Sequence, residues 1–428
     1  MNYNEALEYI HKVNWCFCNP GLERIEKLCT ALDNPQKKLK FIHVAGTNGK
    51  GSFCAMLSGI LTKAGYKTGL FTSPYIKVFN ERMAIDGEMI SNDELAKLTE
   101  KIKPIADKME EKPTEFELIT ALALEYFATH GCDYVVLECG LGGRLDSTNI
   151  IDTSVLSVIT GIALDHTAIL GDTVEKIAYE KAGIIKSGTP CLWCGENKEA
   201  EAVISSKAVE VGSPLHIVDH KKTDIKSFDL SGTVFSYGEY EDIFIPLLGE
   251  YQPFNASNVL CAVDILRNNG VNIDITSVRE GLKNVVWHAR FEIISNNPLV
   301  IADGGHNPEG VCSAVSSVKT YFKDKKLNII SGVMADKDTN YIASQIGSVA
   351  KEVFCITPDN PRALASDKYA ELYRKMGVRA SHYSSVKDAV YASMRNAIDT
   401  GSDVLCVGSL YMYLEVSECV ELFNKENN

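Results

Sequence analysis

The 428-residue sequence has no excess of basic residues: 43 lysines and arginines stand against 56 aspartates and glutamates, a formal net charge of −13. Nucleic acids and anionic membranes are bound through a basic face, so this balance argues against both as partners. No apolar run approaches the roughly 18 residues that a membrane-spanning helix needs. An anionic small substrate stays compatible with the charge, because a local pocket can oppose the overall field.

The first residues, MNYNEALEYIHKVNW, lack the basic stretch and apolar core of a secretion signal. Thirteen cysteines in a long chain without such a signal indicate reduced thiols, and we expect a cytoplasmic location. Cys16 with Cys18 and Cys191 with Cys194 form close pairs, but a zinc site would need another pair at matching spacing. We interpret both pairs as structural, and TPCLWCG (189–195) as a buried strand.

Short β-branched runs alternate with amphipathic stretches along most of the chain, which predicts an α/β fold with a mostly parallel sheet covered by helices. Residues 228–251 differ: FDLSGTVFSYGEYEDIFIPLLGEY predicts a small antiparallel sheet. A new β-α alternation starts at NPLVIADGG. We therefore expect one domain over 1–296 and a second over 297–428, with the boundary near Asn296 and Asn297.

The stretch FIHVAGTNGKGS (41–52) follows a predicted strand and precedes a predicted helix, the setting of a phosphate-binding loop. Its spacing departs from the usual P-loop because Gly51 stands between Lys50 and Ser52. Backbone N–H groups of a glycine-rich turn and a helix N-terminus together bind anions. Lys50 would reach the β- and γ-phosphates, and Ser52 or Thr47 would contact Mg²⁺. The plain alternative is a glycine-rich turn that binds nothing.

The loop GTNGKGS resembles the ATP loop of the Mur ligase superfamily, and specifically of its folate branch, folylpolyglutamate synthase and dihydrofolate synthase. Further blocks resemble that branch in the same order and span almost the whole chain: FTSPYIKVFNERMAIDGEMIS, TEFELIT, LECGLGGRLDSTNI, ITGIALDHTAILGDTVEKIAYEKAGIIKSG, HARFE and DGGHNP. The resemblance implies a P-loop central domain of the Mur ligase type and a Rossmann-like C-terminal domain. It also implies an ATP-dependent ligase that adds L-glutamate to a folate or to dihydropteroate.

Amide formation from a carboxylate needs activation, and ATP supplies it by phosphorylating the carboxylate to an acyl phosphate that an amine attacks. By resemblance, the nucleotide is bound by the loop and by three later residues. These nucleotide-binding candidates are Gly46, Thr47, Asn48, Gly49, Lys50, Gly51, Ser52, Asn255, Arg290 and Asp303. Lys50, Lys181 and His306 are the catalytic candidates. The plain alternatives are a helix cap for Asn255 and a surface charge for Arg290.

Glu138 and Asp165-His166 follow predicted strands, at the carboxyl edge where open α/β sheets bind ligands. By resemblance, Ser73, Glu138 and His166, together with Ser52, hold Mg²⁺. Each has a plain alternative as a buried acid, a turn histidine or a turn serine. The family's lysine at position 181 is carbamylated and helps to hold a second Mg²⁺, whereas an unmodified Lys181 would be a phosphate counter-charge.

For the acceptor, SPYIKVFNERM resembles a mobile loop over the pterin, with Phe79 and Arg82 as contacts. Tyr75 stands where the family usually has histidine, so the pterin contacts do not carry over in detail. Gly305 stands where the family has alanine, and we expect this difference to have little effect. Further substrate candidates in the matching blocks are Thr114, Phe116, Asp146, His306 and Ser409, the last two for the incoming glutamate. TEFE (Thr114 to Glu117) also fits a helix capping box, a purely structural role.

Two other classes of function stay open. A muropeptide ligase would place a nucleotide-sugar domain of roughly a hundred residues before the loop, and 45 residues precede Gly46 here. A nucleotide switch would carry an Asn-Lys-x-Asp motif, which the sequence lacks. The motifs do not separate tetrahydrofolate from dihydropteroate as the acceptor. We expect a monomer.

Overall fold

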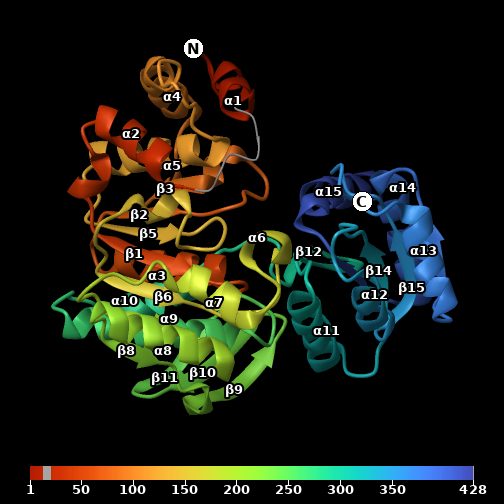
Figure 1. The fold of residues 1–428 in the computed structure, drawn as a ribbon. Coiled ribbons are helices and arrows are strands. Elements are labelled where there is room, and N and C mark those ends of the chain that lie inside the picture. Colours follow the sequence, from red (N-terminus) through yellow and green to blue (C-terminus); the bar gives the residue numbers. More distant parts are fainter. Residues whose placement is uncertain (13–20, 428) are drawn as a thin grey trace. The chain divides into compact units, whose positions relative to one another are not determined.

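The structure is a computed structural model that describes residues 1–12 and 21–427, so the predicted pair Cys16 and Cys18 lies outside the described residues. Over this range the strands form three sheets of eight, three and six strands (Figure 1). The large and the six-stranded sheets are mostly parallel and helices accompany both, so the predicted α/β fold is confirmed.

The large sheet has the strand order β4-β3-β2-β5-β1-β6-β7-β8. Its strands are β1 (Phe41–Ala45), β2 (Thr68–Phe71), β3 (Met83–Ile85), β4 (Glu88–Met89), β5 (Tyr134–Glu138), β6 (Leu156–Ile159), β7 (Cys191–Trp193) and β8 (Leu215–Ile217). From β2 to β8 all neighbours pair in parallel, while β3 and β4 form an antiparallel extension at one edge. The carboxyl ends of β1, β2, β5 and β6 therefore meet along one edge of the sheet.

Helices accompany this sheet and position its loops. They are α1 (Tyr3–Lys12), α2 (Glu23–Ala31), α3 (Lys50–Lys63), α4 (Asn92–Ala106), α5 (Glu115–Thr129), α6 (Thr167–Leu170), α7 (Val174–Ala182), α8 (Lys198–Val211), α9 (Gln252–Asn268) and α10 (Ile275–Lys283), with short 3₁₀ turns η1 (Pro35–Lys38), η2 (Phe79–Arg82), η3 (Ser147–Ile150) and η4 (His220–Lys222). Helix α3 is buried along most of its length, and α10 packs against it. Helices α1, α2, α4 and α5 gather at the β3 end of the sheet (Figure 1).

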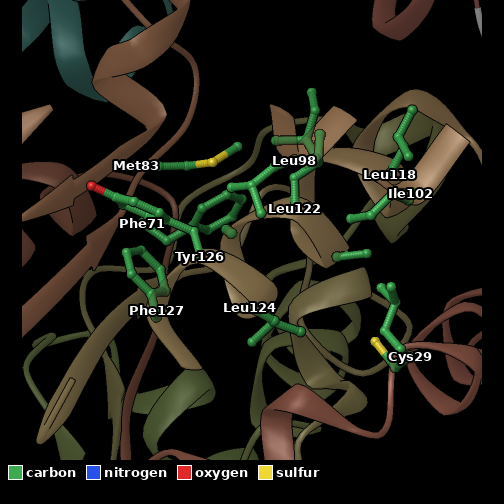
Figure 2. Packing of buried hydrophobic residues seen from close by; sticks show 14 of the residues in the cluster. Cys29, Phe71, Met83, Leu98, Ile102, Leu118, Leu122, Leu124, Tyr126 and Phe127 are labelled. Carbon is green, nitrogen blue, oxygen red and sulfur yellow. The ribbon is translucent and has the colours of Figure 1, made fainter. Parts of the chain in front are cut away.

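An extensive apolar cluster lies where these four helices meet β2 and β5. Figure 2 shows Leu98 and Ile102 of α4 beside Leu118 and Leu122 of α5. The central position of α5 explains its composition: EFELITALALEYFAT is apolar on nearly every face because neighbours cover it on nearly every face. Truncating a fully buried leucine such as Leu122 to alanine would cost about 2–5 kcal/mol.

The second region of the chain is built on a sheet with the order β12-β13-β17-β14-β15-β16. Its strands are β12 (Glu292–Asn296), β13 (Leu299–Asp303), β14 (Leu327–Ser331), β15 (Ala350–Cys355), β16 (Ala380–His382) and β17 (Val404–Val407), and its helices are α11 (Pro308–Phe322), α12 (Thr339–Gly347), α13 (Ser366–Lys375), α14 (Val386–Thr400), η5 (Leu410–Met412) and α15 (Tyr413–Asn427). All strands except β12 pair in parallel. The small sheet consists of β9 (Thr223–Asp229), β10 (Gly232–Tyr237) and β11 (Tyr240–Ile245), which are the strands predicted from the change in texture there.

The chain divides into two compact units at points that differ from the predicted boundary. The first unit comprises 1–224, 235–245 and 254–285, and the second comprises 225–234, 246–253 and 286–428. The predicted boundary at Asn296 and Asn297 falls inside the β12–β13 hairpin, where Asn296 pairs with Leu299. The antiparallel ladder holds β12 to the second sheet, so the longest segment of that unit, 286–428, starts before β12.

Within the described range, no helix combines the length and the apolar character needed to cross a bilayer.

Candidate active site

The predicted phosphate loop lies between β1 and α3, as the sequence indicated. Gly46 fits against β6: a Cβ there would come within 1.7 Å of the Thr160 hydroxyl oxygen. Gly49 has φ of 84° at the N-cap of α3, and a Cβ there would stand 2.9 Å from the Asn255 side-chain oxygen. The Thr160 hydroxyl donates to the Asn48 carbonyl at 2.7 Å. Thus close approach requires glycine at position 46 and the positive φ favours it at position 49, while the Gly49 contact brings the predicted Asn255 to the loop.

Two lysines converge on the Gly46 carbonyl. Lys50 Nζ donates to it at 3.0 Å and to the Thr47 carbonyl at 3.3 Å, and Lys181 Nζ donates to it at 2.8 Å. Lys181 is 4% exposed. Burial, and then the neighbouring Lys50 cation, lower the pKa of Lys181 to about 7. With the N-terminus of α3, where Ser52 is buried, these cations make a site suited to phosphate.

The predicted metal ligands lie at neighbouring strand ends. Glu138 is the last residue of β5 and is 4% exposed, and one of its oxygens accepts the Ser73 backbone N–H at 3.1 Å. His166 caps α6 in the left-handed conformation, with φ of 49°, and its side chain is 43% exposed. In the described part of the chain no three His, Cys, Asp or Glu side chains cluster as for a metal ion. The predicted set relies instead on carboxylate and hydroxyl oxygens, which suit Mg²⁺, with His166 the less usual ligand.

Phe79 and Arg82 lie in η2 and are largely buried. The Arg82 guanidinium carbon is 5.2 Å from the centre of the Tyr75 ring and 5.7 Å from that of Phe79. The two rings are 5.9 Å apart and edge to face. Tyr75, the departure from the family pattern, therefore covers the arginine that we predict to contact the acceptor.

Thr114 and Phe116 lie at the start of α5, and the predicted capping box is confirmed. The Thr114 hydroxyl accepts the Glu117 N–H at 3.3 Å, and the Glu117 carboxylate accepts the Thr114 N–H at 2.7 Å. The Phe116 ring lies over Gly140, where a Cβ would be 2.5 Å from the ring tip. Gly140 in the GLGG block thus leaves room for a predicted substrate contact.

Asp146 is buried, and its carboxylate oxygens accept hydrogen bonds from within the protein. They accept the Leu141 N–H at 2.8 Å, the Thr148 N–H at 3.0 Å and the Thr148 hydroxyl at 2.5 Å. Burial raises the pKa of Asp146, and these hydrogen bonds oppose the rise. The Thr148 oxygen also lies 2.9 Å from His43 Nε2, and burial lowers the pKa of His43 to about 3. Asp146 thus shapes the 139–150 loop, and its role as a substrate contact stays a prediction.

In the second unit, Arg290 and Asp303 are neighbours. Asp303 ends β13 and is 6% exposed. Its oxygens accept the Tyr251 hydroxyl at 2.8 Å, the Phe291 N–H at 2.9 Å and the Gly305 N–H at 2.7 Å. Burial raises the pKa of Asp303, and Arg290 opposes the rise. The structure therefore gives Asp303 a supporting role for the loops around it.

His306 and Ser409 are brought together by the parallel pairing of β13 with β17. The Gly408 N–H donates to the Gly305 carbonyl at 3.0 Å and ties the two following loops to each other. His306 Nδ1 lies 3.0 Å from the Gly304 carbonyl. Ser409 is buried and caps η5 by accepting the Tyr411 N–H. Both lie at the carboxyl edge of the second sheet, where α/β folds bind ligands.

The sequence reasoning missed three supporting residues. Thr160 stands directly after β6, at the same sheet edge as Glu138, so its position at a strand end was a usable signal. Tyr251 and His43 reach their partners only through the fold, and nothing in their spacing pointed to these roles. Cys191 and Cys194 are both buried, and Cys191 lies in β7, so the predicted strand is confirmed.

Comparison with known protein families also divides the chain into two regions. The Mur ligase middle domain matches residues 44–266, and the Mur ligase glutamate ligase domain matches residues 289–410. Both regions of the chain are thus Mur ligase domains. The dihydrofolate synthase/folylpolyglutamate synthase of Bacillus subtilis is 36% identical over 97% of this chain and 98% of its own length. The chain belongs to the dihydrofolate synthase/folylpolyglutamate synthase family.

Solved structures agree over the full length. The folylpolyglutamate synthase of Thermotoga maritima has 34% identity and a TM-score of 0.84, covering 97% of this chain and 96% of that one. Escherichia coli FolC in complex with DHPP and ADP has 30% identity and a TM-score of 0.85, covering 100% of this chain and 99% of that one. The likeness thus extends over both units.

Proposed function

We propose that this chain is an ATP-dependent ligase that joins L-glutamate to a folate-type acceptor, forming ADP and phosphate. The observation that carries this proposal is full-length similarity to folate ligases combined with the loop at Lys50. FolC from Escherichia coli is 30% identical over the whole chain and was solved with DHPP and ADP, a folate-type ligand and the spent nucleotide.

The reaction requires two bond exchanges. A carboxylate oxygen of the acceptor attacks the γ-phosphorus of ATP and releases ADP, which leaves an acyl phosphate. The amine of glutamate then attacks the acyl carbon, loses a proton and releases phosphate. Lys50 and the N–H groups of the loop oppose the charge on the phosphates, and such electrostatic stabilisation is the main demand of phosphoryl transfer.

The residues at the sheet edge fit magnesium. Ser73, Glu138, His166 and Ser52, with Lys181, are proposed to hold two Mg²⁺ ions. The adjacency of Ser73 and Glu138 supports this, since one Glu138 oxygen already faces the Ser73 backbone. Bound Mg²⁺ would neutralise the triphosphate and orient the γ-phosphate.

Lys181 is proposed to act as a carbamate. The neutral amine attacks CO₂, an N–C bond forms and one proton leaves, so a cation becomes an oxygen ligand. Its burial and the nearby Lys50 both favour the neutral amine that this step needs. The alternative is an unmodified Lys181 whose positive charge opposes phosphate. In that case Lys181→Arg should keep its activity, whereas a carbamate predicts that this variant is inactive.

The remaining roles are also proposals. Asn255 lies against the loop and would contact adenine. Arg290 would contact phosphate, and Asp303 would support that arginine. His306 and Ser409, at the edge of the second sheet, would receive glutamate. Phe79, Arg82, Thr114, Phe116 and Asp146 would form the acceptor site. We further propose a cytoplasmic monomer without nucleic-acid or membrane partners.

Acceptor choice separates the candidate functions. Purified protein, ATP, Mg²⁺ and labelled glutamate should be offered tetrahydrofolate, dihydropteroate or a UDP-linked muropeptide, with GTP replacing ATP in a parallel series. We expect label in one or both folate-type products and none in the muropeptide. Label in the muropeptide alone, or GTP binding without ligation, would overturn the proposal in favour of a cell-wall ligase or a nucleotide switch.

A further inference from the structure

The first turn of α5 carries two acidic residues, Glu115 and Glu117, and each is bound by a side-chain nitrogen from one of the first two helices. Arg24 of α2 forms a two-pronged pair with Glu117: its Nε donates at 3.0 Å and one terminal nitrogen at 2.9 Å. Both side chains are largely buried, at 11% and 4% exposure. The same carboxylate accepts the Thr114 N–H in the capping box. Arg24 therefore fixes the carboxylate that in turn fixes Thr114.

His11 of α1 makes the second connection. Its Nδ1 lies 3.0 Å from a Glu115 oxygen, and the Glu115 side chain is 8% exposed. The same ring meets Phe79 edge to face, with centroids 5.7 Å apart and an interplanar angle of 86°. The side chain of His11 thus links the start of α5 to η2. His11 and Glu115 are 104 positions apart in the sequence, and the packing of α1 against α5 brings them together.

A further bond joins the same helix to η2. The Tyr3 hydroxyl donates to the Asn80 side-chain oxygen at 2.7 Å, and the Asn80 amide donates to the Ile90 carbonyl and to Asn92. Helix α1 therefore contacts η2 at both of its ends. Besides packing on α4, α1 thus contacts η2 and the start of α5, and these two segments carry the proposed acceptor residues Phe79, Arg82, Thr114 and Phe116.

We propose that His11 and Arg24 are positioning residues for the acceptor: they hold η2 and the first turn of α5 in the arrangement that binds the pterin-type ring. This inference rests on the proposed function. Neither residue is required at the phosphate loop, so their loss should weaken acceptor binding and leave ATP binding unchanged. A side-chain hydrogen bond contributes modestly to binding geometry, so we expect about a 3- to 10-fold rise in the acceptor KM.

His11 is the residue to test first, because its side chain is 43% exposed and its replacement does not empty a core. His11→Phe keeps an aromatic edge toward Phe79 and removes the bond to Glu115. His11→Asn keeps a polar nitrogen near the Nδ1 position and removes the ring. Glu8→Gln is the matched control, since Glu8 lies on the same helix in an exposed pair with Lys12.

Arg24 gives an independent test of the same proposal. Arg24→Lys keeps the charge but cannot form the two-pronged pair. Lys27→Ala, an exposed residue of α2, is its matched control. For every variant the KM of acceptor, ATP and glutamate, kcat and the thermal midpoint should be measured.

The expected result is a raised acceptor KM with an unchanged ATP KM in both His11→Phe and Arg24→Lys, partial recovery in His11→Asn, and wild-type values in both controls. The thermal midpoint should stay unchanged in His11→Phe and fall in Arg24→Lys, because the Arg24–Glu117 pair is buried. Combining His11→Phe with Glu115→Gln should add little to either change alone. Equal rises in all three KM values, or an unchanged acceptor KM in folded His11→Phe, would overturn the inference. If the wild-type protein itself ligates no folate-type acceptor, the proposed function fails instead.

Discussion

Replacement of Lys181 distinguishes a carbamate from a counter-charge. The pKa of about 7 leaves roughly three quarters of the amine neutral at pH 7.5, against about 0.1% for a lysine at its ordinary 10.5. The population able to react with CO₂ therefore rises about 700-fold. Below pH 7 the amine protonates, so carbamylation is lost as the pH falls through that value and is favoured above it.

Lys181→Ala should lose at least about 100-fold in kcat, because even the supporting partners of metal ligands cost 10- to 100-fold when they are removed. A short carboxylic acid should restore part of the rate by placing an oxygen ligand in the vacated space. Lys181→Arg should stay inactive, since a guanidinium keeps its positive charge and forms no carbamate. The assay is ATP- and acceptor-dependent glutamate ligation, with and without the acid.

Carbamylation can also be observed directly by ¹³C NMR after exchange with labelled bicarbonate. A new carbamate signal should be present in the wild-type protein, absent in Lys181→Ala and weaker below pH 7. An active Lys181→Arg enzyme together with no response to the acid would remove the carbamate and leave Lys181 as a counter-charge.

Three further predictions test other parts of the structure. Lys50→Ala should lower kcat by about 100-fold or more with little change in thermal midpoint, and wild-type turnover in a folded variant would contradict the phosphate loop. His43 has a pKa of about 3 in the folded protein against 6.5 in the unfolded chain, so the buried neutral ring contributes fully to stability above pH 6.5. Up to about 5 kcal/mol of unfolding free energy should be lost as the pH falls toward 3. His43→Gln keeps a donor for Thr148 and should lessen that loss in urea unfolding between pH 6.5 and 3, whereas parallel curves would refute the assignment. Tyr251→Phe removes a bond to the Asp303 carboxylate and should cost about 1.5–3 kcal/mol of unfolding free energy and raise the ATP KM, and no change in either would show that this bond does not support the site.

The strands of both parallel sheets could be predicted because burial on two faces requires continuous β-branched runs, as in FIHVA of β1 and LNIIS of β14. The β3–β4 hairpin was missed, although Asp86-Gly87 between Ile85 and Glu88 is a strong two-residue turn signal and both residues have positive φ. Strand β4 has only two residues, both exposed, so the sequence shows no alternating apolar pattern there. The edge strand β16 has only three residues, none of them buried, and so shows no apolar pattern.

The predicted domain boundary at Asn296 and Asn297 stays a prediction, and the division into compact units differs from it for a physical reason. A turn at Asn297-Pro298 looks like a linker in the sequence, because turn residues mark hairpins and domain junctions alike. Only the pairing of Asn296 with Leu299 distinguishes the two cases. Likewise, local patterns predicted the capping box at Thr114, whereas the Arg24–Glu117 pair joins residues 93 positions apart and left no local signal.

Residue type and strand-end position predicted which side chains lie at the site. They did not predict which of these side chains have their polar atoms already hydrogen-bonded within the protein. Asp146 and Asp303 are both carboxylates near the edge of a sheet. The oxygens of each accept hydrogen bonds from backbone N–H groups and from a neighbouring hydroxyl. A buried carboxylate needs such donors, because an unpaired charge at low exposure costs several kcal/mol. Lys50 and Lys181 differ from these acids because both donate hydrogen bonds to the Gly46 carbonyl, which belongs to the phosphate loop itself. An incoming phosphate can replace the carbonyl partner of Lys50 without leaving a protein charge unpaired, and a carbamate on Lys181 would exchange the Gly46 carbonyl for a metal ion. The two lysines, more than the acids, are therefore expected to change partners when ligands bind.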